Sequence, residues 1–368
     1  MAWMLYGATG YTGKLIIEAA IARGHRPIIA GRNESKVRLL AAQYGVDYAA
    51  FPVEDALEHL LNHDVDLVLN AAGPFIHTSA PMIDACLRAG CDYLDITGEV
   101  AVFEHTFSQD TAARERGIAL ISGVGFDIVP SNCLATYVAG KLPNATSLEI
   151  VVYAISDDFT GSDDFGASAG TLKTMLEMLA EGGCVRRSGE LLPLDFGAGE
   201  RSARFLGETG AVNMRGIAIP WGDVITSYHS THIPNITCYM VIPAPVIPVV
   251  RATGVMIQYL TKIAPLRNWL GKQFDAVVTG PSEQRRDTAR AWVYAEVCDA
   301  AGNHAEAWLE TCEAYRFTAE SAVLSVERTR AGEVAGALSP AQAFGADFVL
   351  DIETSRRYDS LEEHQNHP

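Results

Sequence analysis

Short apolar runs alternate with amphipathic stretches over the first 125 residues of the chain. The runs are rich in β-branched residues and predict strands, whereas the longer stretches, such as 14–24 and 35–45, predict helices with one apolar stripe. A regular alternation of strand and helix is typical of a parallel sheet covered by helices. The six predicted strands lie at 2–6, 26–31, 47–51, 66–72, 91–97 and 118–124.

This pattern predicts an α/β protein whose residues 1–130 form a Rossmann domain, a doubly wound parallel sheet. After Pro130 the apolar runs become longer and alternate with polar positions, which predicts a second, α+β domain over 131–335 with a mainly antiparallel sheet. Within it, Arg290–Val297 and Ala305–Cys312 flank an Ala-Gly-Asn turn and predict a hairpin. A helix at about 339–354, with Ser339 as N-cap, could pack back on the first domain.

Composition narrows the class of protein. A chain of 368 residues exceeds what one hydrophobic core usually supports, which agrees with two domains. Its 28 basic and 45 acidic side chains give a formal net charge of −17, and such a charge repels a polyphosphate backbone. We therefore expect a small-molecule substrate and no nucleic-acid partner.

The seven cysteines are odd in number, scattered and without a CxxC pair, so neither a disulfide framework nor a metal site is predicted. Free thiols fit a reducing cytoplasm, and the first predicted strand leaves no room for a signal peptide. The run Ile236–Val250 contains three prolines and is expected to form a buried strand, a turn and the start of a helix. Contact of this run with a membrane surface is the alternative. Edge strands in the second domain favour a homodimer.

The first predicted strand is followed directly by GATGYTG, a G-x-x-G-x-x-G variant of the dinucleotide fingerprint. Because the motif follows a strand and opens an amphipathic helix, its amides and the helix dipole are placed to bind a pyrophosphate. A tight turn without a ligand is the alternative. The residues expected to bind the cofactor here are Gly7, Ala8, Thr9, Gly10, Tyr11, Thr12 and Gly13.

The end of the second strand indicates which dinucleotide is bound. An acidic residue at this point would bind the ribose 2′-hydroxyl of NAD, but the sequence IIAGRN places Arg32 there. A guanidinium can pair with a 2′-phosphate through two hydrogen bonds, so NADP(H) is favoured over NAD(H). A flavin, or a merely solvated Arg32, are the alternatives.

Three further stretches follow predicted strands: LNAAGPF (69–75), YLDITGE (93–99) and GVGFDIVPSN (123–132). Together with the opening loop they resemble the saccharopine dehydrogenase-like oxidoreductases, a family that includes trans-acting enoyl reductases. The resemblance implies a nicotinamide cofactor held between the Rossmann domain and a substrate domain. It also implies that the first stretch lies by the nicotinamide ribose, through Asn70, Ala71, Gly73, Pro74 and Phe75. The second domain lacks an obvious arginine cluster for a dicarboxylic amino acid, which makes saccharopine itself a poor substrate candidate.

Four residues at the ends of these strands are candidate proton donors or acceptors: Tyr93, Asp95, Glu99 and Asp127. Each has a structural alternative, since Asp95 could fix its own loop, Glu99 could be a helix-terminal charge and Asp127 could cap the next helix.

Two other motifs carry weaker chemical signals. His229 and His232 could contribute a proton from the second domain, but on a strand they would face opposite sides and form no metal site. The GASAG sequence at 166–170 matches a nucleophile elbow, yet no buried strand precedes it, so Ser168 is expected to cap a helix.

The sequence thus predicts an NADP(H)-dependent oxidoreductase. The expected reaction is hydride transfer to or from a carbonyl, an imine or an activated C=C bond of a small substrate, which could be lipid-like. A non-catalytic NADP-binding sensor or scaffold protein is the alternative from another class.

Overall fold

The computed structural model describes residues 2–154, 167–207, 210–278, 280–332 and 334–362. They form two compact units, which we call unit 1 (Met1–Val129 with Tyr315–Phe344) and unit 2 (Pro130–Ala314 with Gly345–Pro368). The sequence analysis assigned residues up to 335 to the second domain, whereas in the structure Tyr315–Phe344 belongs to unit 1. Each unit is described by itself below.

Unit 1 contains a seven-stranded sheet in which every pair of neighbours is parallel. Its order is β15-β6-β5-β4-β1-β2-β3, the Rossmann order with one short strand added at the edge. The order reverses between β1 and β4, which places a crevice for ligands beyond their carboxyl ends. The strands are β1 (Ala2–Tyr6), β2 (Ile28–Gly31), β3 (Tyr48–Ala50), β4 (Val65–Asn70), β5 (Asp92–Asp95), β6 (Ala119–Ile121) and β15 (Gly336–Ala337).

Helices cover both faces of this sheet because the strands are apolar on both sides. One face packs against α1 (Tyr11–Ala22), α2 (Glu34–Tyr44) and α13 (Ala314–Ala331). The other face packs against α3 (Ala56–Asn62), α4 (Ser79–Ala89), α5 (Val100–Ser108) and α6 (Asp110–Arg116). The prediction of a doubly wound parallel sheet is confirmed.

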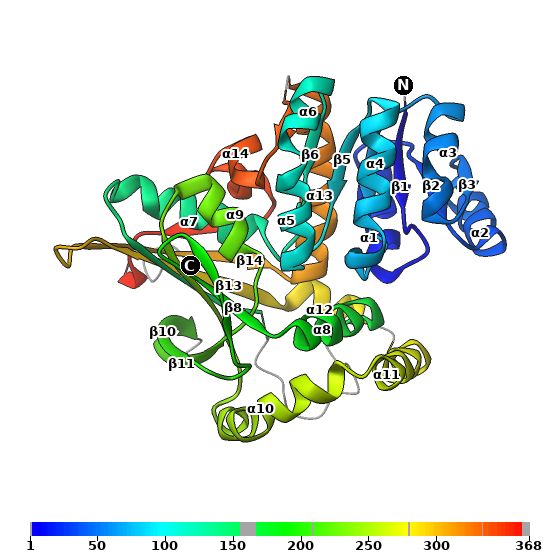
Figure 1. Cartoon of the computed structure of the whole chain (residues 1–368). Helices are drawn as coiled ribbons and strands as arrows, with labels where there is room; N and C mark the ends of the chain where they lie inside the picture. The colour runs from blue at the N-terminus through cyan, green and yellow to red at the C-terminus, as the bar shows by residue number, and fades with distance from the viewer. Residues whose placement is uncertain (1, 155–166, 208–209, 279, 333, 363–368) are drawn as a thin grey trace. The chain divides into compact units, whose positions relative to one another are not determined.

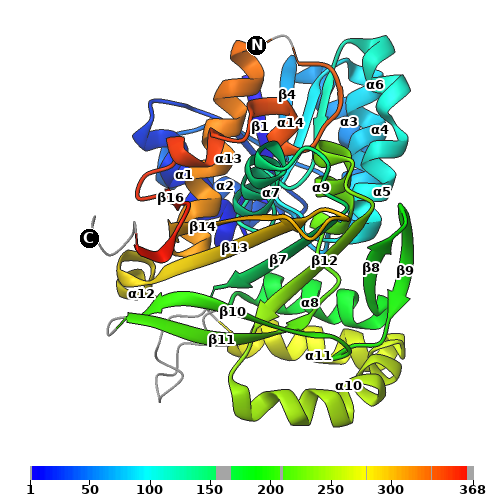
Figure 2. The same cartoon turned by 90° about the vertical axis from the view of Figure 1, so that its left-hand side faces the viewer.

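Helix α13 joins unit 1 through contacts that are distant in sequence. The Thr318 hydroxyl accepts a hydrogen bond from the Phe126 amide at 3.0 Å, and the Ser321 hydroxyl donates to the Val124 carbonyl at 2.8 Å. Near the other end of the helix, Glu327 forms an ion pair with Arg23, and Figure 2 shows α13 (orange) beside α1 (blue). These contacts fix the loop after β6, which carries Asp127.

Unit 2 is built on a mixed sheet in the order β10-β11-β12-β7-β13-β14-β16, in which β8 also pairs with β12 and β9 pairs with β8. Only β12 and β7 pair in parallel, so the predicted, mainly antiparallel sheet is confirmed. The hairpin of β13 and β14 is also as predicted. The strands are β7 (Ser147–Tyr153), β8 (Gly183–Arg187), β9 (Glu190–Leu194), β10 (Glu200–Gly207), β11 (Gly210–Ala218), β12 (Asn235–Val241), β13 (Arg290–Cys298), β14 (His304–Cys312) and β16 (Arg356–Tyr358).

The helices of unit 2 include three that pack on one another: α8 (Ala169–Glu181), α10 (Ile247–Thr261) and α11 (Ala264–Val277) (Figure 1). The run 236–250 forms the strand β12, a 3₁₀ turn (Ala244–Val246) and the start of α10, as expected. Among the described residues, no helix combines the length and the apolar character that crossing a bilayer requires. The other α-helices in the described part of unit 2 are α7 (Val129–Lys141), α9 (Asp223–Thr231) and α12 (Glu283–Thr288).

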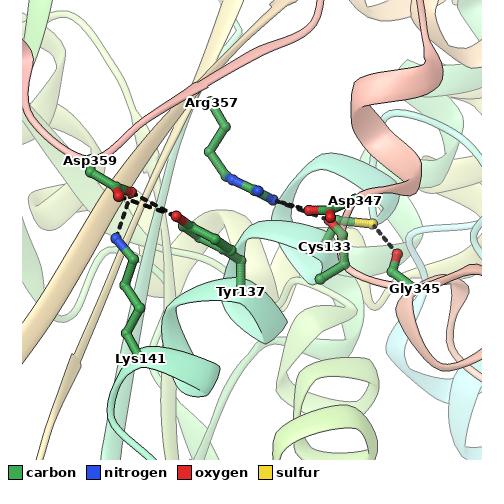
Figure 3. A network of polar contacts seen from close by, with 8 residues as sticks. Cys133, Tyr137, Lys141, Gly345, Asp347, Arg357 and Asp359 are labelled. Carbon is green, nitrogen blue, oxygen red and sulfur yellow. Dashed lines mark hydrogen bonds and ion pairs between the residues drawn. The ribbon is translucent and has the colours of Figure 1, made fainter. Parts of the chain in front are cut away.

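The predicted helix at 339–354 is interrupted. It consists of α14 (Pro340–Phe344) and a 3₁₀ turn (Phe348–Asp351), separated by Gly345 at φ 91°. The chain then lies against α7 in unit 2, where Asp359 accepts hydrogen bonds from Tyr137 at 3.0 Å and Lys141 at 2.5 Å (Figure 3). The Arg357 guanidinium lies over the Tyr137 ring at 3.4 Å and fastens β16 to this helix.

Candidate functional site

The glycine loop closes on the turn after β4. Gly7 follows β1 with φ 88°, and a Cβ atom there would lie 2.6 Å from Ala71 C and Ala72 N. The amides of Gly7 and Ala8 both donate to the Ala30 carbonyl of β2, at 2.9 and 3.2 Å. The ends of β1, β2 and β4 therefore meet at this loop, at the point where the strand order reverses.

The start of α1 is suited to an anion. Gly10 is its N-cap and supplies no side-chain oxygen, and the first turn contains no acidic residue. A Cβ atom at Gly13 would lie 2.5 Å from the Gly7 carbonyl oxygen, so only glycine lets the helix begin this close to the loop. Amides in the first turn of a helix have no partner within the helix, and together with the dipole they attract negative charge.

Arg32 lies where the sequence analysis placed it, immediately after β2, and its side chain is exposed. The next residue, Asn33, caps α2 by accepting a hydrogen bond from the Lys36 amide at 3.0 Å. Burial, followed by the charge of Glu54, raises the pKa of the nearby Tyr6 hydroxyl, while the charge of Arg32 acts in the opposite direction. The charges of Arg32 and Glu54 therefore both act at the end of β1, where Tyr6 is the last residue.

Asn70, the last residue of β4, holds the turn that follows it. Its side-chain oxygen accepts from the Ala72 amide at 3.0 Å, and its amide group donates to the hydroxyls of Thr78 at 3.1 Å and Tyr93 at 3.2 Å. Thr78 in turn donates to the Ala72 carbonyl at 2.8 Å. The turn against which Gly7 packs is thus fixed by a buried side chain.

Tyr93 and Asp95 on β5 form the centre of a buried polar cluster. Asp95 is fully buried and accepts from the hydroxyls of Tyr93 at 2.8 Å and Ser122 at 2.9 Å, and from the amides of Thr97 at 3.1 Å and Gly123 at 2.9 Å. Burial raises the pKa of Asp95 although these hydrogen bonds lower it, and burial raises the pKa of Tyr93 strongly. These hydrogen bonds connect the end of β5 to the end of β6. They correspond to the structural role that the sequence analysis gave as the alternative to catalysis for Asp95.

Glu99 supports the Gly73-Pro74-Phe75 turn. Its two carboxylate oxygens accept hydrogen bonds from the amides of Phe75 at 2.8 Å and Ile76 at 2.7 Å, and its side chain is buried. Although Glu99 precedes α5, its side chain makes no capping bond to that helix. The charge therefore serves the 3₁₀ turn Phe75–His77 and not the helix that follows it in the sequence.

Asp127 differs from the other three candidates because its side chain is partly exposed. Burial raises its pKa from 3.8 to about 6. A Cβ atom at Gly98 would lie 2.8 Å from Asp127 Oδ2, so glycine at this position lets the carboxyl group approach the loop after β5. Of the four, it is the group best suited to exchange a proton near neutral pH.

The described residues of the two weaker motifs lie at the ends of helices and not on strands. His229 lies on α9 and His232 at its C-cap, so the premise that this segment is a strand was wrong. No group of three or more His, Cys, Asp or Glu residues that could hold a metal occurs in the described parts of the chain. Ser168 caps α8 by accepting from the Thr171 amide at 3.2 Å, as expected, while Gly166 lies outside the described residues.

The sequence analysis missed the hydroxyl groups that complete the buried cluster. Ser79 lies 3.2 Å from the Tyr93 hydroxyl, and Ser122 bonds both Asp95 and Thr106. The available signal was a serine directly after the apolar strand β6, next to Gly123.

Comparisons with known proteins agree with this geometry. Residues 3–121 match the family described as the saccharopine dehydrogenase NADP binding domain, which confirms the resemblance for this part of the chain. Trans-acting enoyl reductases of Mycobacterium tuberculosis and Mycobacterium leprae are 33% and 34% identical to it over 138 and 139 residues. Each alignment covers 35% of this chain and 33% of the relative, so the chain matches less than half the length of these curated relatives.

A solved structure extends the likeness to both units. The apo saccharopine dehydrogenase (L-Glu forming) of Saccharomyces cerevisiae superposes with a TM-score of 0.63 at 13% identity. The superposition covers 95% of this chain and 96% of that one, and it shows a shared fold.

Proposed function

We propose that this chain, whose residues 3–121 match a saccharopine dehydrogenase NADP binding domain, is an NADP(H)-dependent oxidoreductase. It would transfer a hydride to or from a carbonyl, an imine or an activated C=C bond of a small, lipid-like substrate. The enoyl reductase names of its relatives support oxidoreductase chemistry. The observation that carries the proposal is the closure of Gly7 on Ala71 and Ala72 beside the glycine-capped start of α1.

The residues present at this crevice fit a dinucleotide. A side chain at Gly7 would collide with Ala71 and Ala72, and one at Gly13 would collide with the backbone of Gly7 and Ala8, so glycine keeps the loop compact. The start of α1 then offers its amides to a pyrophosphate. The turn from Asn70 to Phe75 would flank the nicotinamide ribose, since it borders the same loop. Bound here, the nicotinamide supplies or accepts the hydride.

Arg32 would select NADP(H). Its exposed guanidinium stands at the carboxyl end of β2, where a carboxylate would instead favour the free 2′-hydroxyl of NAD(H). A guanidinium can form two parallel hydrogen bonds with a 2′-phosphate and stack on the adenine ring.

Asp127 would exchange the proton. In the direction of reduction its protonated carboxyl would donate to the substrate atom that gains electron density as the hydride arrives, and in oxidation the carboxylate would accept that proton. Tyr93, Asp95 and Glu99 would act as positioning residues, because their side chains hold β5, β6 and the Gly73-Pro74-Phe75 turn.

One observation favours a second candidate function, an NADP-binding sensor without turnover. Two of the four candidate acid-base groups, Tyr93 and Asp95, are fully buried and bonded to each other. If Asp127 exchanged no proton, binding of the cofactor would be the whole activity of unit 1.

The cofactor assignment is tested by changing one end of β2. Arg32→Asp should weaken NADPH binding at least tenfold and leave NADH binding within about twofold, since a charged hydrogen bond contributes about 1.5–3 kcal/mol. Arg26→Asp, a matched exposed arginine before the same strand, should change neither affinity. Equal losses for both cofactors in Arg32→Asp would contradict the 2′-phosphate role.

Turnover separates the two candidate functions. We expect oxidation of NADPH with one class among apolar ketones, imines and enoyl thioesters. Asp127→Asn should lower kcat about 100-fold while the Kd for NADPH stays unchanged. Tight NADPH binding without turnover of any class would favour the sensor, and unchanged kcat in Asp127→Asn would remove this residue from the mechanism.

A further inference from the structure

Helix α10 of unit 2 is exposed on the face that carries its large apolar side chains. A helix at the surface of a protein in water normally turns its apolar stripe inward. In α10 the residues at spacings of three and four that face outward are almost all apolar: Pro248, Val249, Ala252, Val255, Met256, Tyr259 and Leu260, continued by Ile263. We call these residues the outer face of α10.

The inward side of α10 begins with the buried Ile247, and Val250 and Ile257 are half-buried, whereas its other buried positions are small or polar. Gly254 is buried directly against the Phe196 carbonyl, where no Cβ atom would fit. Thr261 is also buried and donates to carbonyls of its own helix, while Gln258 is only partly exposed and lies against Gly182. The helix is therefore attached to unit 2 by this inward side, and the apolar residues of the outer face are not needed for that attachment.

Exposure on this face is large. Val249, Met256 and Tyr259 are 58%, 57% and 67% exposed, and Trp269 on the adjacent α11 is 56% exposed. The other four tryptophans are buried. Contiguous exposed apolar side chains of this kind mark a surface that is covered by another apolar phase or molecule.

The charge around the outer face runs against that of the rest of the chain. Residues 224–274 contain no Asp or Glu, although the chain has 45 of them among 368 residues. The same stretch contains Arg251, Lys262, Arg267 and Lys272. Two of these cations form ion pairs with acidic residues from elsewhere in unit 2, Arg251 with Glu200 and Arg267 with Glu177. Lys262 lies over the Tyr259 ring at 5.2 Å, so a cation borders the apolar surface directly.

We propose that the outer face of α10, with Trp269 of α11, binds the surface of an anionic lipid bilayer. Apolar side chains with exposed Tyr and Trp, bordered by lysines, are the composition of a helix that lies in the membrane interface. The positive charge of Lys262, which borders the apolar face directly, complements the negative charge of such a surface. The binding is peripheral, and the proposal does not depend on the proposed oxidoreductase activity.

A lipid surface fits this face better than a second copy of the chain. Two-fold contact of α10 with itself would bring Lys262 and Lys272 of both copies together, with no acidic residue from 224–274 to offset them. Both views place α10 at the outer border of unit 2, where a helix can lie against a fluid bilayer (Figures 1 and 2).

Binding of the full chain to vesicles tests the proposal. The chain should float with vesicles that contain phosphatidylglycerol, bind phosphatidylcholine vesicles more weakly, and lose the difference at high salt. Because Trp269 is the exposed tryptophan, brominated lipids should quench its fluorescence, and Trp269→Phe should remove most of that quenching.

Two variants separate the apolar and the charged contributions. Met256→Glu with Tyr259→Glu should lower vesicle binding at least tenfold, because each side chain loses its burial in lipid. Lys262→Glu should lower binding to anionic vesicles about fivefold or more and hardly affect neutral ones. The matched control is Leu61→Glu on α3 of unit 1, where an apolar residue that is 59% exposed gains the same charge. It should bind like the unchanged chain.

The outcomes are distinguishable. NADPH binding, measured in parallel, should be the same in all variants and reports on folding and on the proposed function separately. No binding to anionic vesicles, or full binding by the Met256→Glu, Tyr259→Glu variant, would overturn the proposal. A dimer that this variant converts to monomers, without vesicle binding, would instead assign the face to contact between copies.

Discussion

The two halves of the carboxyl edge of the unit 1 sheet are built in opposite ways. At the ends of β1 and β2, the loop consists of glycine and backbone amides, and the nearby charged side chain, Arg32, is exposed. At the ends of β4, β5 and β6, the polar side chains Asn70, Tyr93 and Asp95 are buried and bonded to one another. The first half offers groups to a ligand, whereas the second half holds its own loops in place.

The comparison distinguishes polar residues that are available to a ligand from polar residues that hold neighbouring loops in position. An acid that accepts four hydrogen bonds in the interior has little capacity left for a substrate. Asp127 is the exception among the candidates, because it follows the buried half in sequence but remains partly exposed.

The largest loss is expected in the buried half. Asp95→Ala removes the side-chain acceptor of two buried amides and breaks the hydrogen bonds from the Tyr93 and Ser122 hydroxyls, so we expect a loss of roughly 4 kcal/mol in the free energy of unfolding. Asp84→Ala, which removes an exposed acid paired with Arg88, should cost about 0.5 kcal/mol or less. Chemical denaturation measures both, and similar losses would contradict the assigned role of Asp95.

The glycine loop should show the next largest effect. Gly7 and Gly24 have nearly equal φ angles, 88° and 84°, but only Gly7 has neighbours that a Cβ atom would strike. Gly24→Ala should cost about 1–2 kcal/mol, the strain of the left-handed conformation. Gly7→Ala should cost more and abolish NADPH binding. Retained binding in Gly7→Ala would show that the close approach to Ala71 is not required.

Glu99 tests the link between the two halves. In Glu99→Gln an amide group replaces one of the oxygens that accept from Phe75 and Ile76, so one hydrogen bond is lost and two N–H groups face each other. We expect a loss of about 2 kcal/mol in stability and about tenfold in NADPH affinity. Glu104→Gln on the exposed side of α5 is the control and should change neither quantity.

Asp127 should give the smallest effect, seen in the pH dependence of stability. Its pKa of about 6 lies above the unfolded value, so its contribution is fully present below about pH 4 and is lost as the pH rises through 6. In the Asp127→Asn variant, the side chain at this position does not titrate. Relative to this variant, the unchanged chain should therefore lose about 2–4 °C in Tm between pH 4 and pH 7. A constant Tm difference over that range would contradict the raised pKa.

The sequence was sufficient for the parts of the fold that depend on local patterns. The strands of unit 1 coincide with apolar runs. The glycine loop and Arg32 can be recognised because each directly follows one of these strands in the sequence. Helix α13 was not assigned to unit 1, because Thr318 and Ser321 contact residues almost 200 positions earlier. Burial was equally inaccessible to sequence analysis. Tyr93 lies on β5 and Asp127 follows β6, and only the packing of the chain buries the first and leaves the second partly exposed.

The central claim is that the open half of this edge binds NADP(H), and calorimetric titration of the purified chain with NADPH and with NADH tests it most directly. We expect binding of NADPH with a 1:1 stoichiometry and an affinity at least tenfold above that for NADH, because in the proposed role Arg32 would pair with the 2′-phosphate that NADH lacks. Failure to bind either cofactor, or a preference for NADH, would contradict the account.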